Sequence, residues 1–189
     1  MAEHVVLFTG PMGAGKTAAI ASLSDIDPVR TEAANTDRVT ADKATTTVAL
    51  DYGEITIGPD EKVRLYGIPG QTRFEFMWKV LMRRAVGMIL LVNNDNPDPI
   101  GQMLYFIDYF HELYERGGAV VAISRSDVGL GPTREEYYSA LAAARPGLSI
   151  PIFSVDARSP EQMKIALFSL ILNIESRAAV PSRYEEPRP

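Results

Sequence analysis

Cysteine is absent from this chain of 189 residues, and tryptophan occurs only once. The lack of cysteine excludes disulfides, thiolate metal sites, thiol catalysis, and the attachment of prenyl or palmitoyl groups to this chain. No apolar run approaches the length that a bilayer requires, since the most notable one, Val86–Val92, is far too short. The net charge of -5 and the lack of a dense cluster of lysine and arginine argue against nucleic acid as the main partner.

The first apolar stretch begins at Val5, which leaves no room for a signal peptide before it. We therefore expect a soluble cytoplasmic protein without a direct membrane anchor, which a partner could recruit to a membrane. A content of 46% hydrophobic residues is enough for a sizeable core. The sequence predicts one domain over residues 1–176 and a flexible, proline-containing tail over residues 177–189.

The segment Gly10–Thr17 has the P-loop spacing G-x-x-x-x-G-K-T, between the apolar run Val5–Thr9 and an alanine-rich stretch that is typical of a helix. Its three glycines allow positive φ, so successive backbone N–H groups can turn towards phosphate oxygens at the start of that helix. Lys16 would reach the terminal phosphates, and the Thr17 hydroxyl would bind Mg²⁺. The predicted phosphate-binding residues are Gly10, Met12, Gly13, Ala14, Gly15, Lys16, Thr17 and Ala18.

Apolar runs that alternate with helical patterns favour an α/β fold, in which a six-stranded, mostly parallel sheet has helices on both faces. Gly58–Asp60 is a turn that makes the second and third strands an antiparallel hairpin. Gly53, where the apolar alternation changes phase, is a candidate β-bulge, and Pro151 predicts an edge strand. No element is expected in the polar stretch 24–46. The six strands are expected at about residues 5–9, 48–57, 62–66, 86–92, 119–123 and 150–155.

Helical patterns cover residues 18–23, 72–84 and 100–116, and two more helices open with capping signals at Thr133 and Ser159. The second helix carries an aromatic stretch that includes Phe74, Phe76 and Trp78. This stretch is consistent with core packing and equally with a surface for a partner.

In a mostly parallel sheet the ligand lies beyond the carboxyl ends of the strands, so the loops at that edge form the candidate site. Gly67–Gln71 follows the third predicted strand, Ser124–Asp127 follows the fifth, and Ser154–Arg158 follows the sixth. Thr45–Thr47 lies just before the second strand. In order and spacing, these segments and the P-loop resemble the Ras-like small GTPases, which have a P-loop NTPase fold called the G domain. In detail they resemble the bacterial branch that works with roadblock-type partners and includes the gliding-motility GTPase. The resemblance covers about residues 4–176.

Two segments, Thr45–Glu54 and Gly67–Phe74, are similar to the two switch segments of that branch. The resemblance implies that Thr47 binds Mg²⁺ and senses the γ-phosphate, with Thr46 as the fallback. A threonine hydroxyl can complete the shell of the metal only when the third phosphate holds its loop in place.

The second switch segment implies the catalytic residues. The Gly70 amide would meet the γ-phosphate, and Gln71 would orient the attacking water while Lys16 neutralises phosphate charge. Two residues near the phosphates depart from the family pattern. Gly67 stands where the family at large has an aspartate that holds Mg²⁺ through water, and Met12 stands where Ras-like enzymes usually have glycine.

The last two loops imply the base-binding residues. Asp127 would accept hydrogen bonds from both N–H groups on the edge of guanine, a pair that adenine does not offer. Arg125 stands where the family usually has lysine, and Ser124 where it has asparagine or threonine. The final base-contacting loop would consist of Asp156, Ala157 and Arg158, with the Ala157 amide at the guanine O6.

The resemblance thus implies a GTP-binding molecular switch with Mg²⁺ as its cofactor. It would hydrolyse GTP to GDP slowly and change its switch segments to control a roadblock-type activator or effector in bacterial signalling or polarity. Two alternatives stay open. Gly67, Met12 and Ser124 motivate a nucleotide-bound scaffold with little turnover. An ATP-dependent P-loop kinase would need a lid with arginines and an acceptor pocket, neither of which the sequence indicates.

Overall fold

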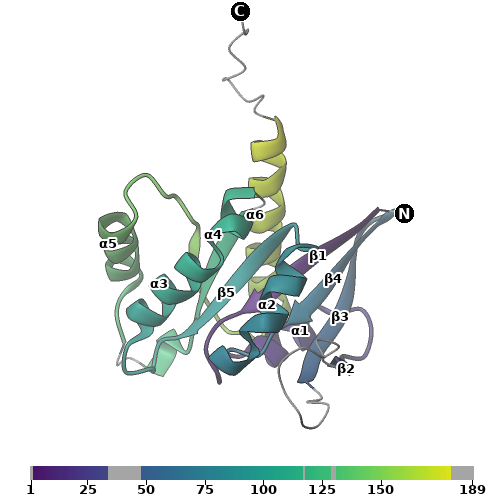
Figure 1. The fold of residues 1–189 in the computed structure, drawn as a ribbon, viewed down its shortest axis with the longest axis horizontal. Helices are drawn as coiled ribbons and strands as arrows, with labels where there is room; N and C mark the ends of the chain where they lie inside the picture. Colours follow the sequence, from purple (N-terminus) through teal and green to yellow (C-terminus); the bar gives the residue numbers. More distant parts are fainter. Residues whose placement is uncertain (1, 34–47, 117, 129–130, 180–189) are drawn as a thin grey trace, which may run out of the picture.

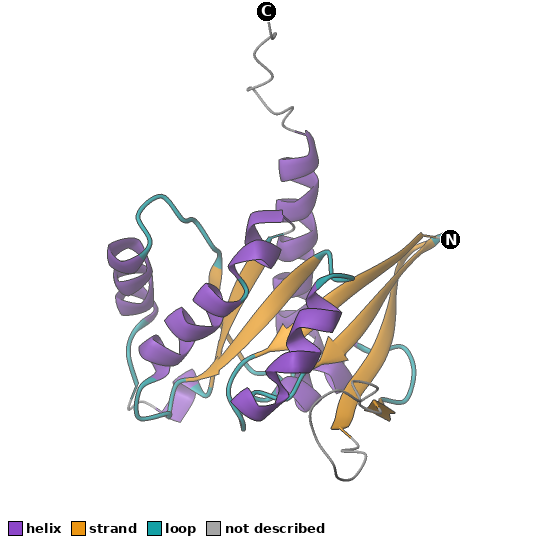
Figure 2. Cartoon of the chain, in the orientation of Figure 1, coloured by secondary structure: helices purple, strands orange, loops and turns teal. Residues whose placement is uncertain are grey.

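The computed structural model describes residues 2–33, 48–116, 118–128 and 131–179. Across these residues one sheet of seven strands runs through the centre of the molecule, with helices on both of its faces (Figure 1; Figure 2). The strand order is β2-β3-β4-β1-β5-β6-β7. The strands are β1 (Ala2–Thr9), β2 (Val29–Ala33), β3 (Val48–Gly58), β4 (Glu61–Gly67), β5 (Gly87–Asn93), β6 (Ala119–Ser124) and β7 (Ile152–Val155).

Helices connect most of the strands, as the sequence predicts. The helices are α1 (Lys16–Leu23), α2 (Glu75–Met82), α3 (Pro99–Tyr109), α4 (His111–Arg116), α5 (Arg134–Ala144) and α6 (Pro160–Ala179), with short 3₁₀ segments η1 (Thr72–Phe74) and η2 (Ser126–Val128). None of the described helices is long and apolar enough to span a membrane.

The sheet is mostly parallel. Strand β1 pairs in parallel with β4 and β5, and β6 pairs in parallel with β5 and β7, whereas β2, β3 and β4 are antiparallel neighbours. All six predicted strands form, and the described residues contain a seventh, β2, inside the polar stretch for which the sequence predicts no element. Strand β2 has no clear apolar alternation, and it forms because its backbone pairs with the outer edge of β3.

Two layers of core lie on opposite faces of the sheet, because β5 and β6 are buried along their whole length. On one face, Leu90 and Val121 belong to a cluster that includes residues of helices α2 to α5. On the other, Ile89 and Val120 belong to a cluster with residues of α1 and α6 (Figure 1). The carboxyl ends of the central strands therefore reach one edge of a sheet whose two middle strands, β5 and β6, are fully buried.

Strand β7 lies at the edge of the sheet, as Pro151 predicts. Pro151 immediately precedes the strand, and its carbonyl oxygen accepts a hydrogen bond of 2.9 Å from the Val121 amide. Proline can accept such a bond but cannot donate one in return. The predicted edge position is confirmed.

The single helix predicted over residues 100–116 is wrong, because two helices, α3 and α4, meet at Phe110. Phe110 leaves the helical conformation with φ of -96° and ψ of 21°. Its fully buried ring packs on Trp78 of α2, with 5.6 Å between the ring centroids. The helix breaks where the Phe110 ring packs against a neighbouring helix. The periodicity of a single helix does not encode such packing.

The aromatic stretch over η1 and α2 divides between the core and the surface. Trp78 is fully buried and donates a hydrogen bond of 2.8 Å to the carbonyl oxygen of Pro69, so it also fixes the loop after β4. Phe74 is half-buried against the same core. Phe76 and Val80, by contrast, are 37% and 61% exposed.

Gly53 does not form a β-bulge, so that prediction is wrong. The β3–β4 pairing is regular at Gly53, and its register shifts between Thr56 and Gly58 instead. A Cβ atom at Gly53 would lie 2.8 Å from the Ser24 Oγ and 2.9 Å from a methyl carbon of Ile20. Glycine is needed here because the end of α1 and the residue after it pack directly on β3.

The predicted capping signals both begin helices. Thr133 and Glu136 form a complete capping box at α5, as predicted. Ser159 accepts a hydrogen bond of 3.3 Å from the Gln162 amide at the start of α6. The Gln162 side chain, however, accepts a hydrogen bond of 2.7 Å from the amide of Asp156, so it supports the loop before α6 rather than a second capping box.

Helix α6 continues to Ala179, past the predicted domain boundary at residue 176. Residues 180–189 lie outside the described residues, so the flexible tail stays a prediction.

Candidate functional site

The loop between β1 and α1 has the backbone conformation that the sequence predicts. Gly10, Gly13 and Gly15 have φ values of +131°, +80° and +98°, which side chains rarely tolerate. A Cβ atom at Gly10 would lie only 1.9 Å from the carbonyl oxygen of Leu91, so glycine also permits a close approach to β5. Gly15 leads directly into α1, whose first N–H groups are suited to an anion.

Lys16 folds back over this loop. Its Nζ donates hydrogen bonds of 2.8 and 2.7 Å to the carbonyl oxygens of Gly10 and Pro11. Burial lowers the pKa of Lys16 to about 8, and the negative charge of Asp51 opposes that fall. An anion held by the loop would favour the protonated amine and raise this pKa again.

The loop after β4 lies against the P-loop. A Cβ atom at Gly70 would lie 2.1 Å from the Gly10 carbonyl oxygen, so the two backbones are in direct contact. The next side chain, Gln71, donates from Nε2 to the sulfur of Met12 at 3.3 Å. Met12 is 73% exposed, so this contact lies at the mouth of the loop. The structure thus brings Gly70, Gln71 and Met12 together at one end of the P-loop.

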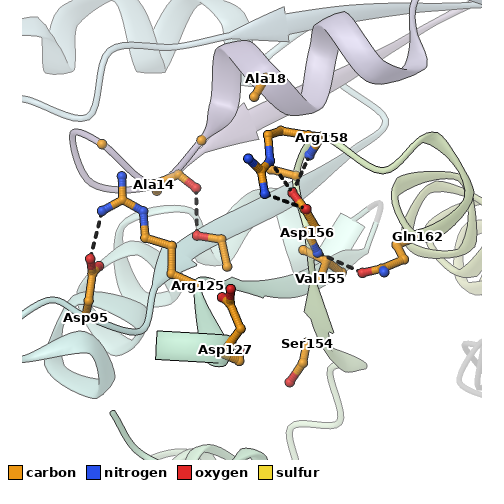
Figure 3. A pocket seen from close by; sticks show the side chains of 15 residues that line it. Ala14, Ala18, Asp95, Arg125, Asp127, Ser154, Val155, Asp156, Arg158 and Gln162 are labelled. Carbon is orange, nitrogen blue, oxygen red and sulfur yellow. Dashed lines mark hydrogen bonds and ion pairs between the residues drawn. The ribbon is translucent and has the colours of Figure 1, made fainter. Parts of the chain in front are cut away.

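At the other end of the P-loop lies a pocket of about 750 Å³ (Figure 3). This volume is in the range of small-molecule and cofactor sites. Four loops line it: those at the carboxyl ends of β1, β6 and β7, as predicted, and the loop after β5, which contributes Asp95. Its lining includes Gly13, Ala14, Gly15, Ala18, Ser124, Arg125, Asp127, Asp156, Ala157 and Arg158, all of them predicted, and it adds Asp95 and Gln162, which the sequence does not single out.

Ser124 joins two of these loops. Its hydroxyl is buried and donates a hydrogen bond of 2.9 Å to the carbonyl oxygen of Ala14 in the P-loop. Ala157 of the third loop is also buried, and a Cβ atom at Gly15 would lie 3.1 Å from the Ala157 Cβ. The loops of the pocket are therefore held to the P-loop by one hydrogen bond and one close contact.

Arg125 has φ of +57°, the one positive value outside glycine among the described residues. A positive φ in a long side chain is a strained backbone that its surroundings must hold. Its guanidinium donates to the Asp95 carboxylate at 2.7 Å, and this hydrogen bond lowers the pKa of Asp95. Asp95 comes from the loop after β5, so it positions Arg125 at the wall of the pocket (Figure 3).

Asp156 and Arg158, two positions apart in the loop after β7, bind each other at the lining of the pocket. Arg158 donates from its side chain to both carboxylate oxygens of Asp156, at 3.0 and 2.9 Å. These hydrogen bonds and that from the Arg158 amide lower the pKa of Asp156 to about 2. Both side chains are exposed, so the pair can rearrange when a ligand enters.

Asp127 lines the same pocket from η2. Across the described ranges its carboxylate makes no hydrogen bond or ion pair, although its charge adds to the larger effect of Asp156 in raising the pKa of Arg158. Asp127 is exposed. Among the described residues it therefore presents an available carboxylate in a pocket that otherwise carries paired charges (Figure 3).

Thr17 lies at the start of α1, where the sequence places a Mg²⁺ ligand, whereas Thr47 and Thr46 lie outside the described residues. Thr17 Oγ1 donates a hydrogen bond of 2.5 Å to Oδ2 of Asp51, a residue of β3 that no sequence pattern marks as part of the site. No group of three or more histidine, cysteine or acidic residues in the described part of the chain could hold a metal ion alone. Mg²⁺ at Thr17 would thus need oxygens from a ligand, as is usual where it binds with phosphates.

Comparison with known proteins relates part of the chain to a family and a short segment to an archaeal protein. A family model described as "Conserved hypothetical ATP binding protein" matches residues 27–130. A segment of 37 residues is 49% identical to an uncharacterized protein of Methanocaldococcus jannaschii. That match covers 20% of this chain and 23% of the archaeal protein, so it spans less than a quarter of the relative.

Proposed function

The chain belongs to the family described as conserved hypothetical ATP-binding proteins, and from this premise we propose that it is a Ras-like nucleotide switch that binds GTP and hydrolyses it to GDP. Nucleotide binding by a P-loop fold is the part that the family supports directly. The guanine base, the switch action and the partner are our proposal.

The pocket beside the P-loop is the observation that carries the proposal. It runs from the loop residues Gly13 and Gly15 to Asp127, and so joins a phosphate cradle to a carboxylate. A nucleotide needs this combination, because its phosphates require N–H donors while its base requires a specific hydrogen-bonding edge. A site that binds only a phosphate ion would not need the carboxylate.

The phosphates of the ligand would replace the contacts that Lys16 now makes. The ammonium group already lies over the P-loop, 2.8 Å from the Gly10 carbonyl oxygen. Inward N–H groups and the start of α1 would add partial positive charge around the same oxygens. Mg²⁺ fits this arrangement, since Thr17 offers a hydroxyl beside the loop and the ion would supply further positive charge to the phosphates.

The base edge favours guanine. Asp127 has a carboxylate that the described contacts leave available, and guanine offers two adjacent N–H donors to one such group. The family description names ATP, and adenine carries no matching pair of donors. Competition between GDP and ADP for the purified protein tests this directly, and the base of the nucleotide that copurifies gives a second answer. Preference for ADP in either measurement would contradict the assignment of guanine.

Hydrolysis would depend on Gln71 and Lys16. Gln71 lies next to Gly70, which contacts the P-loop, so its amide could reach a water near the terminal phosphate. In the structure that amide contacts the Met12 sulfur instead. Catalysis would therefore require Gln71 to leave Met12, a movement that a partner could favour.

Replacing Gln71 by leucine should lower single-turnover GTP hydrolysis about 100-fold, because the attacking water would lose its orientation. The affinity for GDP should stay unchanged, since Gln71 does not line the base pocket. Gln102→Leu on α3 is a matched control and should alter neither quantity. Equal hydrolysis rates in Gln71→Leu and the unmodified protein would refute the catalytic role.

A nucleotide-bound scaffold with little turnover is the second candidate, and the contact between Met12 and Gln71 favours it. Met12→Ala removes the sulfur that holds Gln71. If Gln71 is a competent but restrained catalytic residue, turnover should rise about 2- to 5-fold, the worth of one weak hydrogen bond. Turnover that stays undetectable in the unmodified protein and in Met12→Ala would instead support the scaffold.

A partner surface beside the switch has its own support. Phe76 and Val80 of α2 are exposed apolar side chains a few residues after Gln71. The proposed partner is a roadblock-type activator or effector, which follows from the resemblance of the switch segments. Phe76→Ser should weaken its binding, whereas Phe168→Ser, at an exposed aromatic position on α6, should not.

A further inference from the structure

The carboxylate of Asp51 meets the P-loop from a strand where the sequence gives no reason to expect it. Asp51 is half-buried in β3, and its Oδ2 accepts the hydroxyl proton of Thr17 at 2.5 Å. Thr17 lies in the first turn of α1, and the two residues are 34 positions apart. The contact exists only because β3 folds against α1.

The same carboxylate lies beside the position that lacks an acid. Asp51 of β3 and Gly67 of β4 are direct partners in the antiparallel ladder. A Cβ atom built on Gly67 would come within 3.0 Å of the Asp51 Cβ, 3.3 Å of its Oδ2 and 2.8 Å of Cδ1 of Ile20. The space for a side chain at Gly67 is therefore already taken, in part by a carboxylate that reaches it from the next strand.

The direction of the hydrogen bond matters for a metal. A threonine hydroxyl can offer a lone pair to a cation only if its proton points elsewhere, and here the proton of Thr17 points to Asp51. A carboxylate that accepts from a ligand in this way fixes the orientation of the ligand and increases its basicity. The negative charge of Asp51 also acts to raise the pKa of Lys16. The same carboxylate therefore acts on both residues of the P-loop that would meet the phosphates and the metal.

We propose that Asp51 is the carboxylate of the Mg²⁺ site, where it orients Thr17 and supplies the negative charge that Gly67 cannot. The inference rests on the proposed nucleotide function, because the remaining oxygens around the ion would be those of the phosphates. It assigns the acid of the site to β3 instead of β4.

Asp51→Asn separates this role from a structural one. Asparagine keeps an oxygen that can accept from Thr17 but loses the charge, so the link between β3 and α1 can persist. We expect the Mg²⁺ concentration that half-saturates the GDP complex to rise about 10- to 100-fold. The measurement is the dissociation rate of a fluorescent GDP analogue during a Mg²⁺ titration, with EDTA as the zero point. In EDTA the variant should release the nucleotide no faster than the unmodified protein.

Moving the carboxylate back across the ladder gives the positive test. Asp51→Gly together with Gly67→Asp places the acid on β4, and Ile20→Val removes the methyl carbon that would crowd it. Asp51→Gly with Ile20→Val alone should raise the Mg²⁺ concentration that half-saturates the GDP complex. The triple variant should reverse at least half of that rise, measured on a logarithmic scale. Asp60→Asn, an exposed acid in the β3–β4 turn, is the control and should leave the titration unchanged.

The outcomes separate the two proposals. A folded Asp51→Asn protein with an unchanged Mg²⁺ midpoint would overturn the role of Asp51 while leaving nucleotide binding intact. Failure of the unmodified protein to bind any nucleotide would overturn the proposed function and this inference together. If Asp51→Asn does not fold, the triple variant decides: recovered Mg²⁺ dependence supports the inference, and its absence in a folded triple variant contradicts it.

Discussion

Replacing Asp127 by asparagine is expected to lower the affinity for GDP by about 10²- to 10⁴-fold and to increase that for xanthosine diphosphate. One carboxylate would accept hydrogen bonds from N1–H and from the 2-amino group of guanine, and charge-assisted bonds are worth about 1.5–3 kcal/mol each. Xanthine has an oxygen in place of that amino group, and the amide of asparagine can donate to it. The measurement is competition of each nucleotide against a fluorescent GDP analogue.

Asp127→Ala is the matched control for this exchange of bases. It should lose affinity for GDP to a similar extent, and it should gain none for xanthosine diphosphate because alanine has no donor to offer. ADP binding should be equally weak in all three proteins. A change from Asp127 to asparagine that leaves GDP affinity intact would place the base elsewhere in the pocket.

Replacing Lys16 by methionine should reduce the affinity for GDP by about 2–5 kcal/mol, roughly 30- to 5,000-fold, because the phosphates lose a partly buried cation. The same change should raise the melting temperature of the nucleotide-free protein by roughly 2–4 °C, the shift that about 1 kcal/mol produces in a chain of this size. The reason is that burial already disfavours the charged amine, whose pKa falls from 10.5 to about 8. Calorimetry measures the expected rise in melting temperature, and nucleotide titration on the same sample measures the expected fall in affinity. A loss of stability without a loss of affinity would contradict the role of Lys16.

The pH dependence follows from the same lowered pKa. Bound phosphate favours the protonated amine, so the complex holds the proton more tightly than the free protein does. Affinity for GDP should therefore be constant below about pH 8 and fall as the pH rises through the pKa of free Lys16. For folding without nucleotide the sign is opposite. Because the unfolded chain binds this proton more tightly than the folded protein, the free energy of unfolding gains a contribution between about pH 8 and 10.5. Lys16→Met should abolish both dependences.

Features that depend on neighbours in the chain were predictable from sequence. The glycine conformations of the P-loop follow from the spacing of Gly10, Gly13 and Gly15, and the capping box at Thr133 follows from one residue type three places later. The meeting of three loops at one edge of the sheet also follows from strand order, because parallel strands bring their carboxyl ends together.

Features that depend on pairing between distant strands were not predictable. Asp51 reads as one polar residue in an alternating strand, and only the register of β3 against β4 places it beside Gly67. Asp95 is similar, since its ion pair with Arg125 joins loops that follow different strands. The sequence does not predict strand β2, because an edge strand can form from backbone pairing alone, without an apolar pattern.

Some interpretations failed for reasons of packing. The change of phase at Gly53 indicated a bulge, yet the glycine serves the contact with α1 and the bulge lies near the turn. The long helix over residues 100–116 divides where the Phe110 ring enters the core. In both cases one strand or helix carries a local irregularity that only its neighbour in space explains.

The place of Asp51 in the sheet has a mechanical consequence. Its backbone lies in an interior strand, where Arg30 of β2 pairs with it on one side and Gly67 of β4 on the other. An acid at the end of β4 would begin the very loop that leads to Gln71, and it would be carried along when that loop rearranges. The ladders on both sides hold Asp51 apart from that loop, although Asp51 itself lies in the first segment that resembles a switch. A carboxylate on β3 would therefore link the metal to the first switch segment, while the loop that leads to Gln71 could rearrange without carrying the acid with it.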